Sequence, residues 1–353
     1  MEQERSASPL ARYLLLAYAL LVVYASLHPF SGWTATGVDP FAFLGAPLPR
    51  YLFRIDIFAN IMGYAPLGFL CALSAYPRWR GVRAVAVAGA GALVASFVLE
   101  ALQSYLPSRT PSNLDFAANS AGAILGAILA ASISELLLNE DGLKSVRYRV
   151  FRPGRRVDAG LVMLGLWLFI QLDPQILLFG GGDLRPLFQE AGMELHSAQV
   201  FIRAEAFVAG SNAVAIGLLA SLLASPGQRV RLLYLVIMGI ALGLHTAAYG
   251  VFFGWEDALN WLTPGAWLGL GAGLLIMLAA TQLPRPAQLA LCALAIMSAA
   301  VMVNIAPANP YLVSSLSTWR QGYFEHLVGL TRVISGGWPF LALVYVVSLA
   351  GSR

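Results

Sequence analysis

Two eight-residue segments of this chain place a carboxylic acid, a carboxamide and a glycine at the same spacing. Asp56–Gly63 reads DIFANIMG, and Asp115–Gly122 reads DFAANSAG. On an α-helix, the first, fifth and eighth positions fall within about 60° of one another, so each segment forms one polar stripe. Because an acid and an amide are costly in hydrocarbon, each stripe indicates a buried polar site or a specific contact between helices.

A third segment adds another acid and amide on one helical face. Glu100 lies inside an apolar run, Gln103 follows three residues later, and Arg109 comes in the next short polar loop. At 1.5 Å per residue, Glu100 lies about 10 Å below the end of its helix. We therefore expect the following side chains at a similar depth: Asp56, Asn60, Glu100, Gln103, Arg109, Asp115 and Asn119.

These residue types suit the recognition of a polar group. The acids Asp56, Glu100 and Asp115 can accept hydrogen bonds or pair with cations, and the three carboxamides can complete a polar lining. Arg109 can pair with Glu100 or hold a phosphate or carboxylate of a ligand. Such a set predicts a ligand-binding polar pocket.

Structural interpretations stand beside the functional one. Asp56 and Asp115 can cap the N-termini of their helices. Asn60 and Asn119 can join helices by hydrogen bonds worth about 1 kcal/mol each. Arg109 can be an ordinary interfacial charge. An acid inside an apolar run needs a partner or water, so the functional interpretation is strongest for Glu100.

The composition indicates a polytopic membrane protein. Of 353 residues, 58% are hydrophobic and 11% are charged, whereas a soluble domain has about 25% charged residues. The two cysteines, Cys71 and Cys292, lie in apolar stretches and indicate neither a disulfide framework nor a metal cluster. The net charge of +4 is explained by membrane topology, and no nucleic-acid partner is expected.

Ten segments are apolar enough to span a bilayer, which needs about 20 residues. They are 10–27, 57–76, 84–106, 115–138, 158–179, 204–224, 231–253, 264–283, 287–306 and 337–351. With both termini cytoplasmic, 15 of the 22 Lys and Arg residues lie on the cytoplasmic side, as the positive-inside rule requires. The sequence therefore predicts an all-α polytopic membrane bundle of about ten transmembrane helices, with the polar side chains near the outer interface.

A basic segment divides the chain. Residues 139–157 carry six positive charges and are expected to form a cytoplasmic linker against anionic lipid heads. The predicted domains are a four-helix membrane domain at 1–138 and a six-helix membrane domain at 158–353.

Small residues at four-residue spacing predict close helix contacts. Gly122 and Gly126 form one row, and Gly265, Gly269 and Gly273 form another. Rows of this kind let helix backbones approach closely in lipid, and we assign them a structural role.

Other polar residues in apolar runs have mainly structural interpretations. Asp173 precedes a proline and is expected in a turn or cap. His245 and Tyr249 lie one turn apart and could line a polar path, but we favour a hydrogen-bonded core histidine at position 245. No HExxH zinc motif, phosphate-binding glycine-rich loop or GxSxG elbow is present, so no metal or other cofactor is expected.

Residues of about 14–131 resemble the VanZ-like family of bacterial membrane proteins, named for a teicoplanin-resistance protein. The resemblance depends on Asp56-x3-Asn60, Pro66-Leu67-Gly68-Phe69, Glu100-x2-Gln103, Arg109, Asp115, Asn119 and Gly122. It implies a multi-pass protein of the bacterial cytoplasmic membrane, associated with reduced susceptibility to glycopeptides that bind wall precursors. The six later spans lie outside the pattern.

Three functional hypotheses remain open. The first is a cell-envelope protein that recognises an amphiphilic ligand in an outer-facing pocket, either a lipid-linked wall precursor or a glycopeptide antibiotic, with membrane lipids as further partners. The second is an intramembrane enzyme acting on a lipid-linked glycan, with Glu100 or an Asp as general base. The third is a proton-coupled transporter, which the same-direction repeat of Asp, Asn and Gly disfavours because transporters commonly contain inverted repeats.

Overall fold

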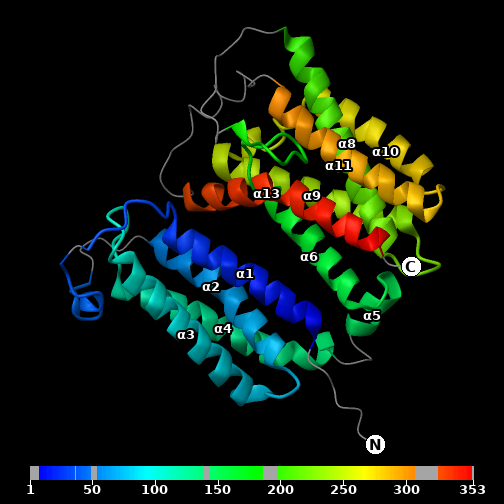
Figure 1. The fold of residues 1–353 in the computed structure, drawn as a ribbon. Coiled ribbons are helices and arrows are strands. Elements are labelled where there is room, and N and C mark those ends of the chain that lie inside the picture. The colour runs from blue at the N-terminus through cyan, green and yellow to red at the C-terminus, as the bar shows by residue number, and fades with distance from the viewer. Residues whose placement is uncertain are drawn as a thin grey trace, which may run out of the picture. The chain divides into compact units, whose positions relative to one another are not determined.

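The computed structural model describes residues 8–35, 37–48, 54–138, 143–185, 197–306 and 325–351. In these ranges the regular elements are α-helices and two short 3-10 helices, η1 (Ala42–Gly45) and η2 (Trp255–Asp257). No strand occurs in them, and an isolated β-bridge joins Phe151 to Ala224. The all-α prediction is confirmed (Figure 1).

Eight helices of the described ranges are long and apolar enough to cross a membrane. They are α1 (Pro9–Leu27), α2 (Arg54–Ala75), α3 (Gly81–Gln103), α4 (Asn113–Leu138), α8 (Ala198–Leu223), α9 (Val230–Phe253), α11 (Arg285–Ile305) and α13 (Glu325–Ala350). Two predicted spans correspond to shorter helices, α6 (Arg155–Ile170) with 16 residues and α10 (Pro264–Ala280) with 17. Each predicted span thus falls on a helix, and which face is cytoplasmic stays a prediction.

One predicted span is too long. The apolar span was placed at 158–179, but the helix α6 ends at Ile170 and turns follow, including the turn expected at Asp173. The cause is local, because the Asp173 Oδ1 accepts a hydrogen bond from the backbone N–H of Gln175 at 2.9 Å and closes a turn. Pro174 also disfavours a helical conformation of the residue before it. Apolar composition alone did not reveal this turn.

The chain divides into two compact units, Met1–Tyr148 and Arg149–Arg353. The division falls within the segment 139–157 that was expected to be a linker. Part of that segment is helical, because α5 extends over Leu143–Val150.

In the first unit, α4 packs against both α2 and α3, and α1 packs against α2 and α3 (Figure 1). The contact between α2 and α4 depends on glycine. A Cβ atom added at Gly122 or Gly126 would overlap the backbone carbonyls of Ile61 and Ala65. The predicted row of small residues is therefore confirmed, and it brings the two helix backbones together.

In the second unit, α8 is the central helix and is mostly buried. It packs against α6, α9, α10 and α11, and α13 packs against α6 and α11. The predicted row of Gly265, Gly269 and Gly273 lies on α10 and faces α8, where an added Cβ at each would overlap backbone atoms of α8. This second row is also confirmed.

Candidate functional site

Asn60 of α2 and Asp115 of α4 form a direct contact between helices. The Asn60 Nδ2 donates a hydrogen bond to the Asp115 Oδ1 at 2.7 Å. Both side chains are half-buried and lie within the first two turns of their helices. The contact therefore places an amide and an acid from the two repeated segments at the same end of the first unit.

Glu100 of α3 binds the start of α4. Its side chain is 4% exposed, and its Oε2 accepts a hydrogen bond from the Ser112 backbone N–H at 2.9 Å. The Ser112 Oγ in turn accepts from the N–H groups of Leu114 at 3.1 Å and Asp115 at 3.4 Å. The suggestion that the Asp115 side chain caps this helix is therefore wrong, because Ser112 provides the cap and Asp115 is left to bind Asn60.

Gln103 and Arg109 bind the C-terminal end of α1. The Gln103 Nε2 donates to the Ser26 carbonyl at 2.9 Å. The Arg109 Nε donates to the His28 carbonyl at 3.1 Å, and an Arg109 Nη donates to the Ala25 carbonyl at 2.7 Å. The last carbonyls of a helix have no partner inside it, and a cation is favoured near them by the helix dipole. These two side chains therefore hold α1 against the rest of the unit.

Asn119 lies in the interior of the first unit. It is 5% exposed, and its Nδ2 donates to the Ser96 Oγ of α3 at 3.1 Å. The Asn119 Oδ1 is buried and has no hydrogen-bond partner. The Tyr64 side chain hydrogen-bonds to the side chains of Ser26 and Ser96, and it lies close enough to Glu100 for the two to interact electrostatically.

The charged groups of the set interact with one another. The carboxylate of Asp115 interacts electrostatically with those of Asp56 and Glu100. Asp56 is exposed, so the three acids run from the surface, through a half-buried position, to the interior. Burial lowers the pKa of the Arg109 guanidinium, and the negative charge of Glu100 opposes that shift. The suggested pairing of Arg109 with Glu100 is thus present as a charge interaction.

Three polar partners were missed by the analysis of the sequence. Tyr64 lies one turn after Asn60, and Ser96 lies one turn before Glu100. Extending each polar stripe by one turn would have found both. Ser112 carries the signal of an N-cap, a serine directly before an apolar helix.

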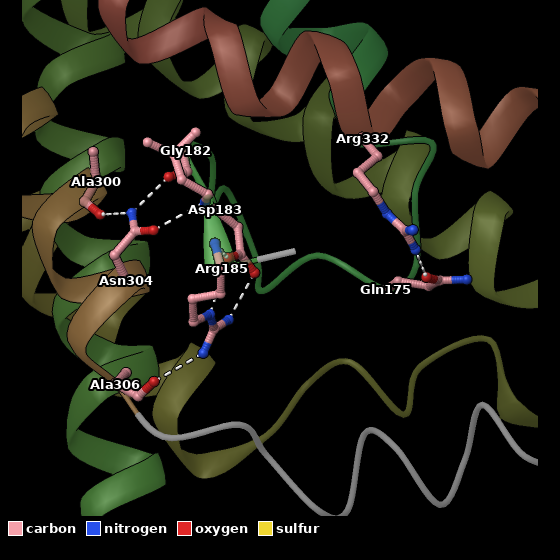
Figure 2. Close-up of polar contacts among 9 residues, drawn as sticks. Gln175, Gly182, Asp183, Arg185, Ala300, Asn304, Ala306 and Arg332 are labelled. Carbon is pink, nitrogen blue, oxygen red and sulfur yellow. Dashed lines mark hydrogen bonds and ion pairs between the residues drawn. The ribbon is translucent and has the colours of Figure 1, made fainter. Parts of the chain in front are cut away.

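A second group of polar contacts ties a loop to α11 in the second unit (Figure 2). The Asn304 Nδ2 donates to the carbonyls of Gly182 at 2.6 Å and Ala300 at 2.7 Å, and its Oδ1 accepts from the Leu184 N–H at 2.9 Å. One carboxamide thereby holds two loop residues in place.

The same loop contains an ion pair. The Arg185 Nε and one Nη donate to the two carboxylate oxygens of Asp183 at 2.9 Å and 2.7 Å, and its other Nη donates to the Ala306 carbonyl at 2.8 Å (Figure 2). The hydrogen bonds that Arg185 donates to the Asp183 carboxylate raise the pKa of Arg185, although burial opposes the shift. Figure 2 also shows Arg332 of α13 donating to the Gln175 Oε1 at 2.9 Å.

Two structural expectations for the second unit are confirmed. Asp173 lies in a turn, and its Oδ2 also accepts from the Thr331 hydroxyl of α13 at 2.8 Å. His245 is 2% exposed, and its Nδ1 is 3.0 Å from the Gln171 carbonyl oxygen. It is therefore a hydrogen-bonded core histidine, as favoured above.

A metal site finds no support in the described part of the chain. There, no group of three or more His, Cys, Asp or Glu side chains is arranged to hold an ion.

Comparison with known proteins agrees with the residues assembled in the first unit. Residues 10–136 match the family model VanZ/LLP1. They form a VanZ-like domain. The match includes all seven candidate residues and ends before the second unit begins. No curated protein and no solved structure matches the chain.

Proposed function

We propose that the VanZ-like domain is a recognition module of the bacterial cell envelope. In the cytoplasmic membrane, its polar cluster binds the head of an amphiphilic ligand at the outer face, either a lipid-linked wall precursor or a glycopeptide antibiotic. This binding contributes to glycopeptide resistance. The observation that supports the proposal is the line of interacting carboxylates from exposed Asp56, through Asp115, to buried Glu100.

The position of the cluster suits an amphiphilic ligand. Large apolar side chains such as Leu16 and Leu20 of α1 are exposed and are suited to contact lipid tails. The acids and amides instead gather at one end of α2 and α4, beyond the apolar middle of the helices. A molecule with a polar head and an acyl chain can satisfy both surfaces at once.

Recognition is favoured over catalysis by the way the acids are held. A general base must reach the proton that it removes. Glu100 is 4% exposed, and its Oε2 is occupied by the Ser112 N–H. Asp115 accepts from Asn60. These hydrogen bonds fix the orientation of both carboxylates, and an ionised carboxylate can accept further hydrogen bonds from a ligand.

The proposal is tested by binding to the full-length protein in lipid nanodiscs. Teicoplanin and a fluorescent lipid-linked wall precursor are titrated against the wild type and Asp115→Asn. We expect at least one of the two to bind, and Asp115→Asn to weaken that binding about tenfold through loss of a charge-assisted contact. The matched control is Asp257→Asn, which makes the same change at an exposed position of η2. Equal affinity of wild type and Asp115→Asn would contradict the proposal.

A second measurement separates recognition from the alternatives. Bound ligand is recovered and its mass determined, and we expect it to be unchanged. Conversion that is lost in Glu100→Gln would support an enzyme instead, and proton-dependent uptake into vesicles would support a transporter. In cells, we expect the wild-type protein, but not Asp115→Asn, to raise the teicoplanin concentration that inhibits growth.

A further inference from the structure

The polar cluster of the VanZ-like domain has a strongly acidic character. The carboxylate of Asp115 lies close enough to interact with the charges of both Asp56 and Glu100. Like charges at close range repel, and the repulsion is greater where water is partly excluded. A cation that enters such a cluster relieves this repulsion, whereas an anion increases it.

The nearby cation is already engaged. Two of the donor groups of Arg109 bind the carbonyls of Ala25 and His28 at the end of α1. Turning the guanidinium toward a phosphate would remove these contacts from the helix terminus. Arg109 therefore serves the packing of α1, and its positive charge offsets the negative charge of Glu100, so the three acids and this one cation together leave the cluster acidic.

A neutral acceptor in the interior points to the same kind of ligand. The Asn119 Oδ1 is buried without a hydrogen-bond partner, in a residue that is 5% exposed. Asn119 lies one turn from Asp115 on α4, and its Nδ2 reaches Ser96, which lies one turn from Glu100 on α3. Asn119 is therefore a buried residue within one turn of Asp115 on α4, and it is joined to the turn of α3 that precedes Glu100. A buried acceptor without a partner is unfavourable, and a group with several N–H donors satisfies it.

We propose that this cluster selects a protonated primary amine in the head group of its ligand. The inference depends on the proposed recognition function and specifies its chemistry. An ammonium group has a positive charge and three donors, so it can bind Asp115 and Glu100 by charge-assisted hydrogen bonds and donate to Asn119. Such an amine occurs in the head group of an aminophospholipid and on a glycopeptide or a peptide stem.

The test uses the wild-type protein, so it does not depend on whether a variant folds. Full-length protein is placed in nanodiscs of phosphatidylglycerol, which contains no amine. Two pairs of probes are titrated by calorimetry, namely short-chain phosphatidylethanolamine with its N-acetylated form, and teicoplanin with its N-acetylated form. Acetylation removes the charge and leaves the rest of each molecule unchanged. We expect the free amine to bind about tenfold more tightly in the pair that provides the ligand, and that pair identifies the source.

A further probe tests the contribution of N–H donors. Short-chain phosphatidylcholine keeps the positive charge but has no N–H group, so we expect it to bind more weakly than phosphatidylethanolamine. Binding of either probe pair that is insensitive to acetylation would overturn the amine inference while leaving the recognition function intact. Failure of every probe, and of the lipid-linked precursor, to bind would overturn both.

Discussion

Asn60 and Asp115 join α2 to α4 by a hydrogen bond of 2.7 Å between an amide and a carboxylate. Further along both helices, Gly122 contacts Ile61 and Gly126 contacts Ala65. Residue numbers therefore rise in the same direction along α2 and α4. The two helices are therefore parallel neighbours. The glycine contacts bring the backbones close, and the polar bond fixes the register at one end.

Removing the amide should weaken this bundle. In Asn60→Leu, the Asp115 carboxylate loses its donor while it stays half-buried, so we expect a loss of about 1 kcal/mol in the free energy of unfolding. Unfolding in mixed micelles measures the change. Ser132→Ala is the control, because Ser132 is exposed on α4 and bonds only within its own helix. An unchanged stability of Asn60→Leu would show that the bond does not join the helices.

Adding a single methyl group at the helix crossing should be more damaging. In Gly126→Ala, the new Cβ would overlap the Ala65 carbonyl, which is backbone and cannot turn aside. We expect a loss of about 1–3 kcal/mol as the helices separate. Gly91→Ala on α3 makes the same change where no atom lies within 4 Å, and it should be neutral or slightly stabilising. Similar melting temperatures for the two variants would contradict the close contact.

Arg109 should matter for the end of α1 more than for binding. Arg109→Lys keeps the charge but loses the fork that reaches both the Ala25 and His28 carbonyls. We expect faster amide hydrogen exchange in the last turn of α1 and a loss of about 1 kcal/mol in stability. Exchange followed by mass spectrometry locates the effect. Arg83→Lys at an exposed position of α3 is the control, and a uniform change across the unit would contradict a local cap.

Asn304 should hold the loop that contains Gly182 and Leu184 in the second unit. Asn304→Leu leaves the Leu184 N–H and the Gly182 carbonyl without their partner, so we expect a loss of about 1–3 kcal/mol. Limited proteolysis should cut the loop faster, and thermal unfolding gives the magnitude. Asn260→Ala is the control, since its side chain bonds only to Asp257 at an exposed site. Wild-type proteolysis rates in Asn304→Leu would contradict this role.

The sidedness of the membrane can be checked directly. In a chain that lacks Cys71 and Cys292, a cysteine at Ser108 should react in intact cells with a maleimide that cannot cross the membrane. A cysteine at Arg80 should react only after the cells are opened. Both positions are exposed, Arg80 directly before α3 and Ser108 in the loop that follows it. The reverse pattern would invert the predicted orientation.

The sequence predicted what depends on periodicity within one helix. The helices fell where apolar length required them, and the glycine rows lay at the helix contacts because a small residue every fourth position has few other structural uses. The end of the span 158–179 was wrong because the turn at Asp173 depends on one side-chain contact to Gln175. Apolar content does not encode such a contact.

For the candidate site, the sequence predicted how far each polar side chain lies from the helix ends, but it did not predict the hydrogen-bond partners of these side chains. The polar stripes and their common distance from the helix ends follow from residue spacing. That Gln103 and Arg109 turn toward α1 follows from the position of α1, because the groups they bind there are backbone carbonyls, which residue types do not distinguish. That Asp115 binds Asn60 depends on Ser112 taking the capping role. Such choices between competing partners are decided by tertiary contact.

The central position of α8 has a consequence for biogenesis. This helix precedes α9, α10 and α11 in the chain, so during synthesis it enters the bilayer before most of the neighbours that later enclose it. The helix must therefore be apolar enough to enter lipid alone, and its side chains must be small enough for other helices to pack closely against it later. Its mean hydropathy of 1.9 suits insertion into lipid. Its many alanines suit close helix packing, because a methyl side chain is both apolar and small. A bulky polar residue in α8 would impair its insertion into the membrane, whereas a bulky apolar residue would impair only the later packing of helices around it.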